Sequence, residues 1–293
     1  MLITVASGKG GTGKTTVAVN IASILAKSNQ SLYYVDCDVE EPNGALFLNP
    51  EINSEQTFSL PKPDVIEELC DGCGICKDIC RFNSIVIVRD KAIIFPELCH
   101  SCGGCTLVCP IDAISEIQEE IGVIRKGNSG DLGFIEGRLK IGIPTAVPLI
   151  KEVKKALPCN CDAIIDAPAG TSCPVIETVR GTDYVLLVTE PTPFGLHDLM
   201  IAVETVRKLN LPFGVVINRS GIGDDRVNNY CIEEGIPLMA EIPDSRSAAE
   251  LYSRGKLLYE KLPEFKEIFE SIPVAIKREL IQFKNNIKEK VDL

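Results

Sequence analysis

One short stretch near the start of the chain, Gly8–Thr16, constrains the fold more than any other. It contains the pattern G-x-x-x-x-G-K-[ST], which runs from Gly8 to Thr15. An apolar run in residues 2–6 precedes it and is typical of a buried parallel strand, and apolar side chains at helical spacing follow it in residues 17–25. Such a loop lets backbone N–H groups surround a phosphate chain at the positive end of a helix. The sequence therefore predicts an α/β fold with a nucleotide site; the alternative is a glycine-rich turn carrying a surface lysine.

Within this loop the residue types suit ATP and its magnesium ion. Lys14 is expected to reach the β- and γ-phosphates, and the Thr15 hydroxyl is expected to hold Mg²⁺. The residues predicted to surround the nucleotide here are Gly8, Gly10, Gly11, Thr12, Gly13, Lys14, Thr15 and Thr16.

A second lysine, Lys9, stands near the start of the loop, which reads K-G-G-x-G-K-T. This loop resembles that of the deviant Walker A ATPases, a family that includes MinD, the Mrp-type iron–sulfur carriers and the nitrogenase iron protein. The resemblance implies a homodimer in which Lys9 crosses the interface and touches the partner's nucleotide. A second ammonium there would stabilise charge that develops during phosphoryl transfer. The alternative is a solvated loop lysine.

Composition excludes several other classes of protein. The 293 residues are 45% hydrophobic, which is ample for a core in one large domain or in two. The net charge of −11 argues against non-specific binding to nucleic acid. Without a run of about 18 apolar residues or a signal peptide, a cytoplasmic location is expected and a membrane is not. Thirteen cysteines in such a chain indicate metal ligation rather than disulfides.

Eight of the cysteines form two matching runs, each spaced C-x-x-C-x-x-C-x-x-x-C. The segment Cys80–Ile85 echoes Cys109–Ile114, so the runs are an internal repeat. This is the spacing of two-cluster ferredoxins, in which the fourth cysteine of each run ligates the other cluster. A zinc site is the alternative, although three cysteines spaced by two residues would crowd a four-ligand zinc site. The first run has Arg81 where proline is usual. The two [4Fe–4S] quartets predicted are Cys70, Cys73, Cys76 and Cys109, and Cys99, Cys102, Cys105 and Cys80.

These motifs divide the chain into two units. Residues 1–57 and 122–293 are predicted to form the ATPase, a doubly wound, mostly parallel sheet with helices on both faces and the phosphates at the carboxyl ends of its strands. Residues 58–121 are predicted to form a small inserted α+β ferredoxin domain, with Pro61 and Pro63 marking a linker.

A second buried strand is expected from Ser31 to Asp36, followed by the sequence D-C-D. In the resembled family this segment is switch I, which implies that Asp38 orients or deprotonates the attacking water and that Asp36 lies near the metal. A carboxylate can accept a water proton at hydrogen-bond reach. The alternative for either aspartate is a helix cap. Cys37 lies between them, points the other way and is expected to pack.

Three later strands are each followed by a family segment. The strand that ends at Asp166 resembles Walker B, which implies that Asp166 holds Mg²⁺ through water and that Gly170 lets backbone approach the γ-phosphate. The resemblance places Asn218 at the adenine, whereas the residues alone also allow a turn role. The remaining nucleotide-binding residues it implies are Arg219, Pro243 and Asp244.

Other features leave alternatives open. Cys173 follows Gly170 closely and is a candidate for a cluster that bridges two subunits, or else a packed thiol. Cys159 and Cys161 should lie at the opposite end of the strand from Cys173. A stripe formed by Leu280, Phe283, Ile287 and Val291 is expected to dock on the core, with membrane attachment as the alternative.

Three functions remain in view. The first is an ATPase that couples nucleotide-driven dimer closure to electron transfer through the two clusters, with a redox partner. The second is an assembly factor that loads or releases a metal cluster for a client protein. The third is a positioning ATPase of the MinD kind, with clusters as sensor or structure. ATP, Mg²⁺ and two [4Fe–4S] clusters are the cofactors expected.

Overall fold

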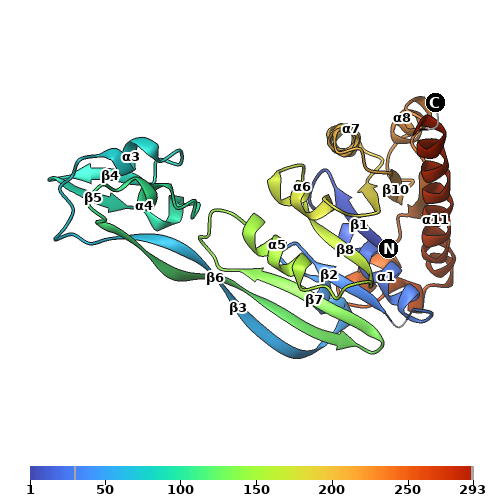
Figure 1. Ribbon diagram of the computed structural model, residues 1–293. Coiled ribbons are helices and arrows are strands. Elements are labelled where there is room, and N and C mark those ends of the chain that lie inside the picture. Colours follow the sequence, from blue (N-terminus) through green and yellow to red (C-terminus); the bar gives the residue numbers. More distant parts are fainter. Residues whose placement is uncertain (30, 292–293) are drawn as a thin grey trace.

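The computed structural model describes residues 1–29 and 31–291. Its main sheet has nine strands in the order β11-β10-β9-β1-β8-β2-β7-β6-β3 (Figure 1). The first seven in this order are parallel, and β6 runs antiparallel to both β7 and β3. The parallel strands are β1 (Leu2–Ser7), β2 (Leu32–Asp36), β7 (Leu132–Leu139), β8 (Asp162–Ala169), β9 (Tyr184–Thr189), β10 (Phe213–Ser220) and β11 (Leu238–Pro243). The prediction of a mostly parallel α/β sheet is confirmed.

The central strands are apolar because helices cover both of their faces. Every residue of β9 is buried, which is the pattern of a parallel strand covered on both sides. One face carries α1 (Lys14–Ala26), α10 (Leu258–Lys261) and α11 (Pro263–Val291). The other face carries α5 (Val147–Lys155), α6 (Cys173–Val179), α7 (Pro193–Lys208) and α8 (Arg226–Glu233). Two short helices, α2 (Gly44–Leu48) and α9 (Arg246–Tyr252), lie in connections after β2 and β11.

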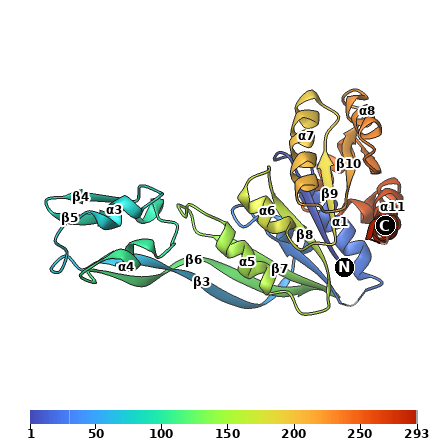
Figure 2. The same ribbon diagram turned by 45° about the horizontal axis from the view of Figure 1, so that its top comes forward.

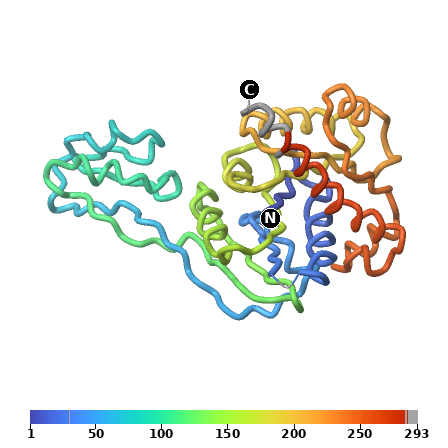
Figure 3. Tube along the Cα trace, turned by 45° about the vertical axis from the view of Figure 1, so that its right-hand side comes forward, coloured from blue at the N-terminus to red at the C-terminus, as the bar shows by residue number. Residues whose placement is uncertain are grey.

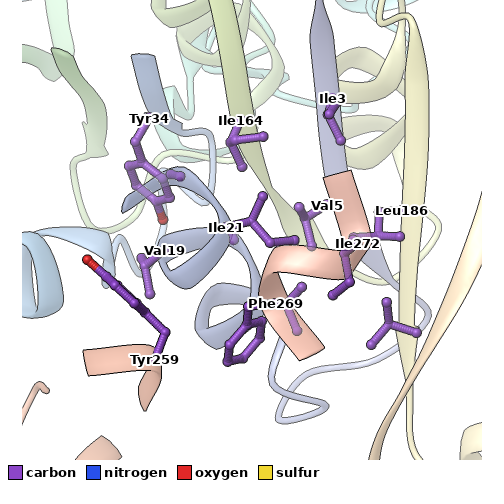
Figure 4. Close-up of a cluster of buried hydrophobic side chains, with 14 of the residues drawn as sticks. Ile3, Val5, Val19, Ile21, Tyr34, Ile164, Leu186, Tyr259, Phe269 and Ile272 are labelled. Atoms are coloured by element: carbon purple, nitrogen blue, oxygen red, sulfur yellow. The ribbon is translucent and has the colours of Figure 1, made fainter. Parts of the chain in front are cut away.

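The long helix α11 belongs to the core. Phe265, Phe269, Ile272, Ile276 and Leu280 are buried in the cluster that also contains the apolar side chains of α1. Figure 4 shows Phe269 and Ile272 beside residues of α1, β1 and β9, and the trace of α11 runs alongside that of α1 (Figure 3).

The predicted stripe of the C-terminal segment is thus docked at Leu280, and Phe283 is 36% exposed. The side chains of Ile287 and Val291 lie outside the described residues. No helix in the described ranges is long and apolar enough to cross a membrane.

Two unusually long strands, β3 (Glu51–Val65) and β6 (Ile114–Ser129), pair along almost their whole length. Because β6 pairs with β7 only from Gly122 onward, residues 58–65 and 114–121 leave the main sheet as a two-stranded arm. The arm carries residues 66–113, here called the cysteine unit, at its far end (Figure 1, Figure 2). The predicted boundaries, 58 and 121, fall where the arm leaves the sheet.

The predicted linker around Pro61 and Pro63 is wrong, since both prolines lie inside β3. Proline interrupts a strand by removing an N–H donor, but an edge strand tolerates it where that donor would face solvent. The two prolines are two residues apart, so their missing donors fall on the same edge of β3, and the pairing with β6 continues through both positions. The connection is therefore a β-ladder rather than flexible chain.

Within the cysteine unit the sequence repeat is also a structural one. It contains α3 (Ile75–Ile79), α4 (Gly104–Val108), a 3₁₀ turn (Pro96–Leu98) and a small antiparallel sheet of β4 (Ile85–Val88) and β5 (Lys91–Ile94). Ile66 N donates to Ala113 O at 2.9 Å, and Phe95 N donates to Ser84 O at 2.8 Å. Each of these positions is 29 residues from its counterpart (66 and 95, 84 and 113), so the two halves are related by a pseudo-twofold exchange.

Candidate functional site

The phosphate loop lies where the sequence places it, between the end of β1 and the start of α1. Gly13 has φ +90°, and a Cβ there would lie 2.1 Å from Asn218 Nδ2. A Cβ on Gly8 would lie 2.3 Å from the Asp198 carbonyl oxygen. Only glycine fits both positions, one for its backbone conformation and both for the close approach.

The Lys14 ammonium stands at the centre of a group of carboxylates. Its Nζ lies 2.7 Å from Asp166 Oδ1 and 3.8 Å from Asp38 Oδ2, and Lys14 is 7% exposed. The register that pairs Asp36 with Asp166 brings the ends of β2 and β8 together at this point. Burial opposes the charged form of Lys14, but Asp166, Asp38 and Asp36 together raise its pKa. The ammonium therefore stays charged and is held by the carboxylates that stand beside the phosphate loop.

Asp166 is fixed by two donors on neighbouring elements. Lys14 donates to Oδ1, and the Tyr34 hydroxyl donates to Oδ2 at 3.0 Å. Tyr34 is fully buried, and a Cβ on Gly44 would lie 2.3 Å from its ring. Tyr34 was missed from the sequence because a tyrosine in a buried strand looks like core, and nothing local shows which carboxylate its hydroxyl meets.

The Asp36 carboxylate bonds to the backbone where the chain leaves β2 and enters α2. Its Oδ1 accepts from Asp38 N at 3.1 Å and its Oδ2 accepts from Gly44 N at 2.9 Å, at the start of α2. Burial and the Asp166 charge raise its pKa well above the usual range. This geometry is that of the capping alternative, and the predicted role of Asp36 near Mg²⁺ stays a prediction. Cys37 is fully buried, as expected for packing.

An open cleft of about 480 Å³ lies over the phosphate loop, a size suited to a nucleotide. Asn218 Nδ2 donates to Thr12 O at 2.8 Å, which ties the end of β10 to the loop. Asn43, Ser245 and Tyr252 also line the cleft and were not predicted. The predicted residues that line it are Lys9, Gly10, Gly11, Gly13, Lys14, Thr15, Thr16, Asp38, Asn218, Arg219, Pro243 and Asp244. Gly170 lies behind the loop, where its N–H donates to Ser7 O.

Glu190, the residue after β9, holds two cations at one rim of the site. Lys9 Nζ lies 3.4 Å from Glu190 Oε2, and Arg219 Nη1 lies 2.8 Å from Oε1. Lys9 is 30% exposed, so within one chain it is only loosely held. The pairing of Glu190 depends on tertiary contacts, so no local pattern in the sequence indicates it.

In the cysteine unit, a small cavity is lined by all four cysteines of the first predicted quartet. They come from both runs, Cys70, Cys73 and Cys76 from one and Cys109 from the other, and Ile75, Ile87, Ile111 and Ile114 complete the apolar wall. Gly74 and Gly103 adopt left-handed φ values of +84° and +72°, which start α3 and α4 directly after the second cysteine of each run.

Part of the second predicted quartet lies where α3 and α4 meet. The Cys102 sulfur and the Ile79 side chain both lie within 4 Å of where a Cβ on Gly104 would stand, and Cys80 follows Ile79. Backbone N–H groups donate to cysteine sulfurs from Ala92 to Cys70, Ser101 to Cys99 and Ala113 to Cys109, at 3.2–3.4 Å. Such N–H···S bonds are among the interactions that stabilise cluster ligands.

Among the described residues, no three His, Cys, Asp or Glu side chains converge on a point that a single metal ion would occupy. A four-iron cluster is held differently, because its thiolates surround the whole cluster and each binds its own iron. The cavity lined by four cysteines, with its apolar wall and N–H···S donors, fits that group. The two quartets themselves stay a prediction.

Three further cysteines lie outside the two cysteine runs. Cys173 begins α6, while Cys159 and Cys161 precede β8, so they lie at opposite ends of that strand as expected. His100 stacks on Phe82, with ring centroids 3.8 Å apart.

A phosphate loop between the first strand and helix of a parallel sheet, with an acidic strand end facing its lysine, defines a P-loop nucleotide-binding protein. Residues 3–258 match the model of the CobQ/CobB/MinD/ParA nucleotide binding domain, and the chain belongs to this family. It is similar to an uncharacterized protein of Methanocaldococcus jannaschii, with 32% identity over 286 residues, which cover 87% of this chain and 90% of the relative.

Two further comparisons give similarities at lower identity. The chain is 25% identical to a protein of Pyrococcus horikoshii named iron-sulfur cluster carrier protein, across 92% of this chain and 83% of that one. Among solved structures, the septum site-determining protein MinD of Pyrococcus horikoshii, complexed with Mg-ADP, matches with a TM-score of 0.56 at 21% identity. That match covers 94% of this chain and 93% of the other, and it shows the common fold.

Asp38 gives a first testable prediction. Burial raises its pKa from the ordinary 3.8 to about 6, although Lys14 pulls it down. Between these values the folded chain binds more protons than the unfolded chain, so stability falls as pH rises through this window. Asp38→Asn should therefore stabilise the nucleotide-free protein by about 1–3 kcal/mol at pH 7.5, and by little at pH 4. Urea unfolding at both pH values measures this.

The control is Glu41→Gln, which alters an exposed carboxylate in the same segment and should change little. A loss of stability in Asp38→Asn at pH 7.5 would contradict the prediction, as would a gain of equal size at both pH values.

Proposed function

We propose that the protein is an ATPase whose nucleotide cycle controls electron transfer through a two-cluster iron–sulfur unit. Family membership supports nucleotide binding, and the chemistry of the cleft supports hydrolysis. Thr15 and Asp166 are proposed to hold Mg²⁺, with Asp36 beside them. With phosphates bound, Lys14 would turn from Asp166 to the β- and γ-oxygens, and Asp166 would then be free to help hold Mg²⁺. The lysine and aspartate already in contact would thus exchange partners as ATP binds.

The hydrolytic step is proposed to depend on Asp38 and Lys9. Asp38 lines the cleft, is partly exposed and would accept the proton of the attacking water. Its pKa of about 6 leaves it ionised near neutral pH and basic enough for this role. Lys9, now on Glu190, is proposed to reach the nucleotide of a partner subunit in an ATP-bound homodimer.

The cysteine unit is proposed to hold two [4Fe–4S] clusters, one on Cys70, Cys73, Cys76 and Cys109 and one on Cys99, Cys102, Cys105 and Cys80. When bound, such clusters supply one-electron donors and acceptors. The chain's contribution is to fix the sulfur ligands through the repeat and its N–H···S bonds, and to keep the apolar cavity around the first quartet dry.

One observation carries the coupling between the two units. Val39, the residue after Asp38, accepts a backbone hydrogen bond from Leu139 N at 2.8 Å. The next residue, Lys140, donates through its backbone N–H to Ile121 O at 2.8 Å, and its ammonium lies 3.2 Å from Glu120. Residues 120 and 121 form the base of the arm. A movement of the Asp38 segment therefore has a direct hydrogen-bonded route to the arm, and the ladder of β3 and β6 extends it to the cysteine unit.

The relatives named iron-sulfur cluster carrier proteins favour a second candidate function, in which ATP drives delivery of a cluster to a client. Transfer of iron and sulfide to an apo-protein, dependent on ATP, would identify it. A positioning role of the MinD kind is supported by the fold alone.

Cluster content is the first prediction of this proposal. Protein purified without oxygen should contain about eight iron and eight sulfide per chain, because two [4Fe–4S] groups have complete ligand sets. Cys105→Ala should lose one cluster, whereas Cys159→Ala, which removes an exposed cysteine outside the runs, should lose none. Iron and acid-labile sulfide analysis decides this, and zinc in place of iron would contradict it.

Dimer formation is the second prediction of this proposal. Wild-type protein should dimerise with ATP, Lys9→Ala should lose hydrolysis, and Asp38→Ala should keep the ATP-bound dimer but not hydrolyse. Light scattering and phosphate release measure both properties, with the exposed Lys256→Ala as the matched control. Full turnover by Lys9→Ala would rule out its proposed role.

Coupling between the bound nucleotide and the clusters is the third prediction of this proposal. The midpoint potentials should differ between ADP and a non-hydrolysable ATP analogue, and reduction should change ATP affinity by the same free energy, typically about 1–3 kcal/mol. Lys14→Ala removes the proposed contact with the phosphates. In this variant the midpoint potentials of the clusters should be the same with ADP and with the ATP analogue. Superimposable wild-type curves, together with unchanged ATP affinity, would reject direct coupling.

A further inference from the structure

One lysine at the end of the arm and one lysine in the cysteine unit occupy matching positions of the cysteine repeat. Lys62 on β3 donates through Nζ to Cys99 O at 2.6 Å and to Pro96 O at 3.2 Å. Lys91 on β5 donates through Nζ to Cys70 O at 2.7 Å and to Glu67 O at 2.6 Å. Lysine and acceptors are each 29 residues from their counterparts (62 and 91, 96 and 67, 99 and 70). Each ammonium thus donates to the carbonyl oxygen of the first cysteine in the run that belongs to the other half of the repeat.

These contacts fix the loops that begin the two cysteine runs. Cys70 and Cys99 are the first predicted ligand of each quartet, and each has its carbonyl oxygen held by one ammonium while its sulfur accepts a backbone N–H. The carbonyl three residues earlier is held by the same ammonium, so the turn that leads into the cysteine is closed at both ends. The lysines therefore position the backbone from which these sulfurs project.

The two lysines differ in burial. Lys62 is 4% exposed, whereas Lys91 is only partly buried. Across the described part of the chain, neither ammonium has a carboxylate within 4.0 Å, so each is neutralised only by carbonyl dipoles. An unpaired charge in a low-dielectric interior is costly, and a nearby anion offsets that cost. A [4Fe–4S] cluster with four thiolates is such an anion.

We propose that Lys62 and Lys91 are positioning residues for the two clusters: each fixes the first cysteine of one quartet and places a positive charge beside that cluster, which raises its reduction potential. The inference rests on the proposed function, since it needs both clusters to be present. Reduction adds negative charge, so an adjacent fixed cation favours the reduced state. Because solvent screens Lys91 more than Lys62, Lys62 has the larger effect, and it acts on the quartet of Cys99.

Lys62 also lies on the arm, opposite Ile117 of β6. The arm thus reaches the second quartet through this side chain, in addition to its covalent connection. A shift of the arm along the route from Val39 would move the Lys62 ammonium relative to Cys99, so the same lysine gives the nucleotide cycle a way to act on one cluster more than on the other.

The experiment compares Lys62→Met, Lys62→Arg, Lys91→Met and Lys91→Arg in the full chain, purified without oxygen. Redox titrations followed by electron paramagnetic resonance give the midpoint of each cluster, assigned with the single-cluster variants Cys73→Ser and Cys102→Ser. Lys62→Met should lower the midpoint of the Cys99 quartet, Lys91→Met should lower that of the Cys70 quartet by less, and both arginine variants should stay close to wild type. Lys77→Met, which removes an exposed lysine of the same unit, is the matched control.

The outcomes separate the two proposals. Selective loss of one quartet's iron in a methionine variant, with rescue by arginine, supports positioning even where the potential cannot be read. Full iron content with wild-type midpoints in both methionine variants would overturn the inference, as would shifts no larger than that of Lys77→Met. Wild-type protein without about eight iron would instead refute the proposed function.

Discussion

One buried ion pair, between the Lys14 ammonium and the Asp166 carboxylate, organises the cleft at the carboxyl ends of the parallel strands. The pair joins the first turn of α1 to the end of β8, and the register of β2 and β8 adds the second carboxylate, Asp36. The Tyr34 hydroxyl donates to Asp166, and its ring packs against Gly44, where a larger residue would not fit. A buried pair of this kind is weak evidence for stability, since desolvation offsets much of the attraction. Its value lies in holding the loop and the strand ends ready for a phosphate chain.

The same strand ends determine how a signal can leave the nucleotide cleft. Asp38 and Val39 follow β2 directly, and the Val39 carbonyl is bonded to the end of β7. Since β7 also pairs with β6, the arm begins next to a segment that lines the cleft. A flexible tether would have separated the two units mechanically. A two-stranded ladder resists bending within its plane of hydrogen bonds, so the cysteine unit is placed by the sheet itself.

Charge is distributed unevenly between the two sites. Beside the phosphate loop, the carboxylates of Asp166 and Asp38 lie within 4.0 Å of the single buried Lys14 ammonium, so acidic groups outnumber basic ones there. Burial, together with the Asp166 charge, raises the pKa of Asp38. Around the cysteine runs the arrangement is reversed: the Lys62 and Lys91 ammonium groups bond to backbone carbonyls beside the thiols, and no carboxylate of the described residues lies within 4.0 Å of them. Each arrangement thus suits a ligand of the opposite sign, a cation at the cleft and an anion beside the cysteine runs.

The sequence alone determined the features that depend on local spacing. The phosphate loop needs its glycines within a few residues, buried parallel strands appear as apolar runs, and the cysteine repeat is a direct repeat of residue spacing. The fold class and most residues that line the cleft therefore followed from the sequence. Tertiary structure decided the rest, because it depends on which strands become neighbours. Only the fold shows Pro61 and Pro63 in an edge strand, Tyr34 on Asp166, Glu190 between Lys9 and Arg219, and Lys62 on the Cys99 loop 37 residues away. Contacts of this kind join residues far apart in the chain, and no local pattern encodes their partners.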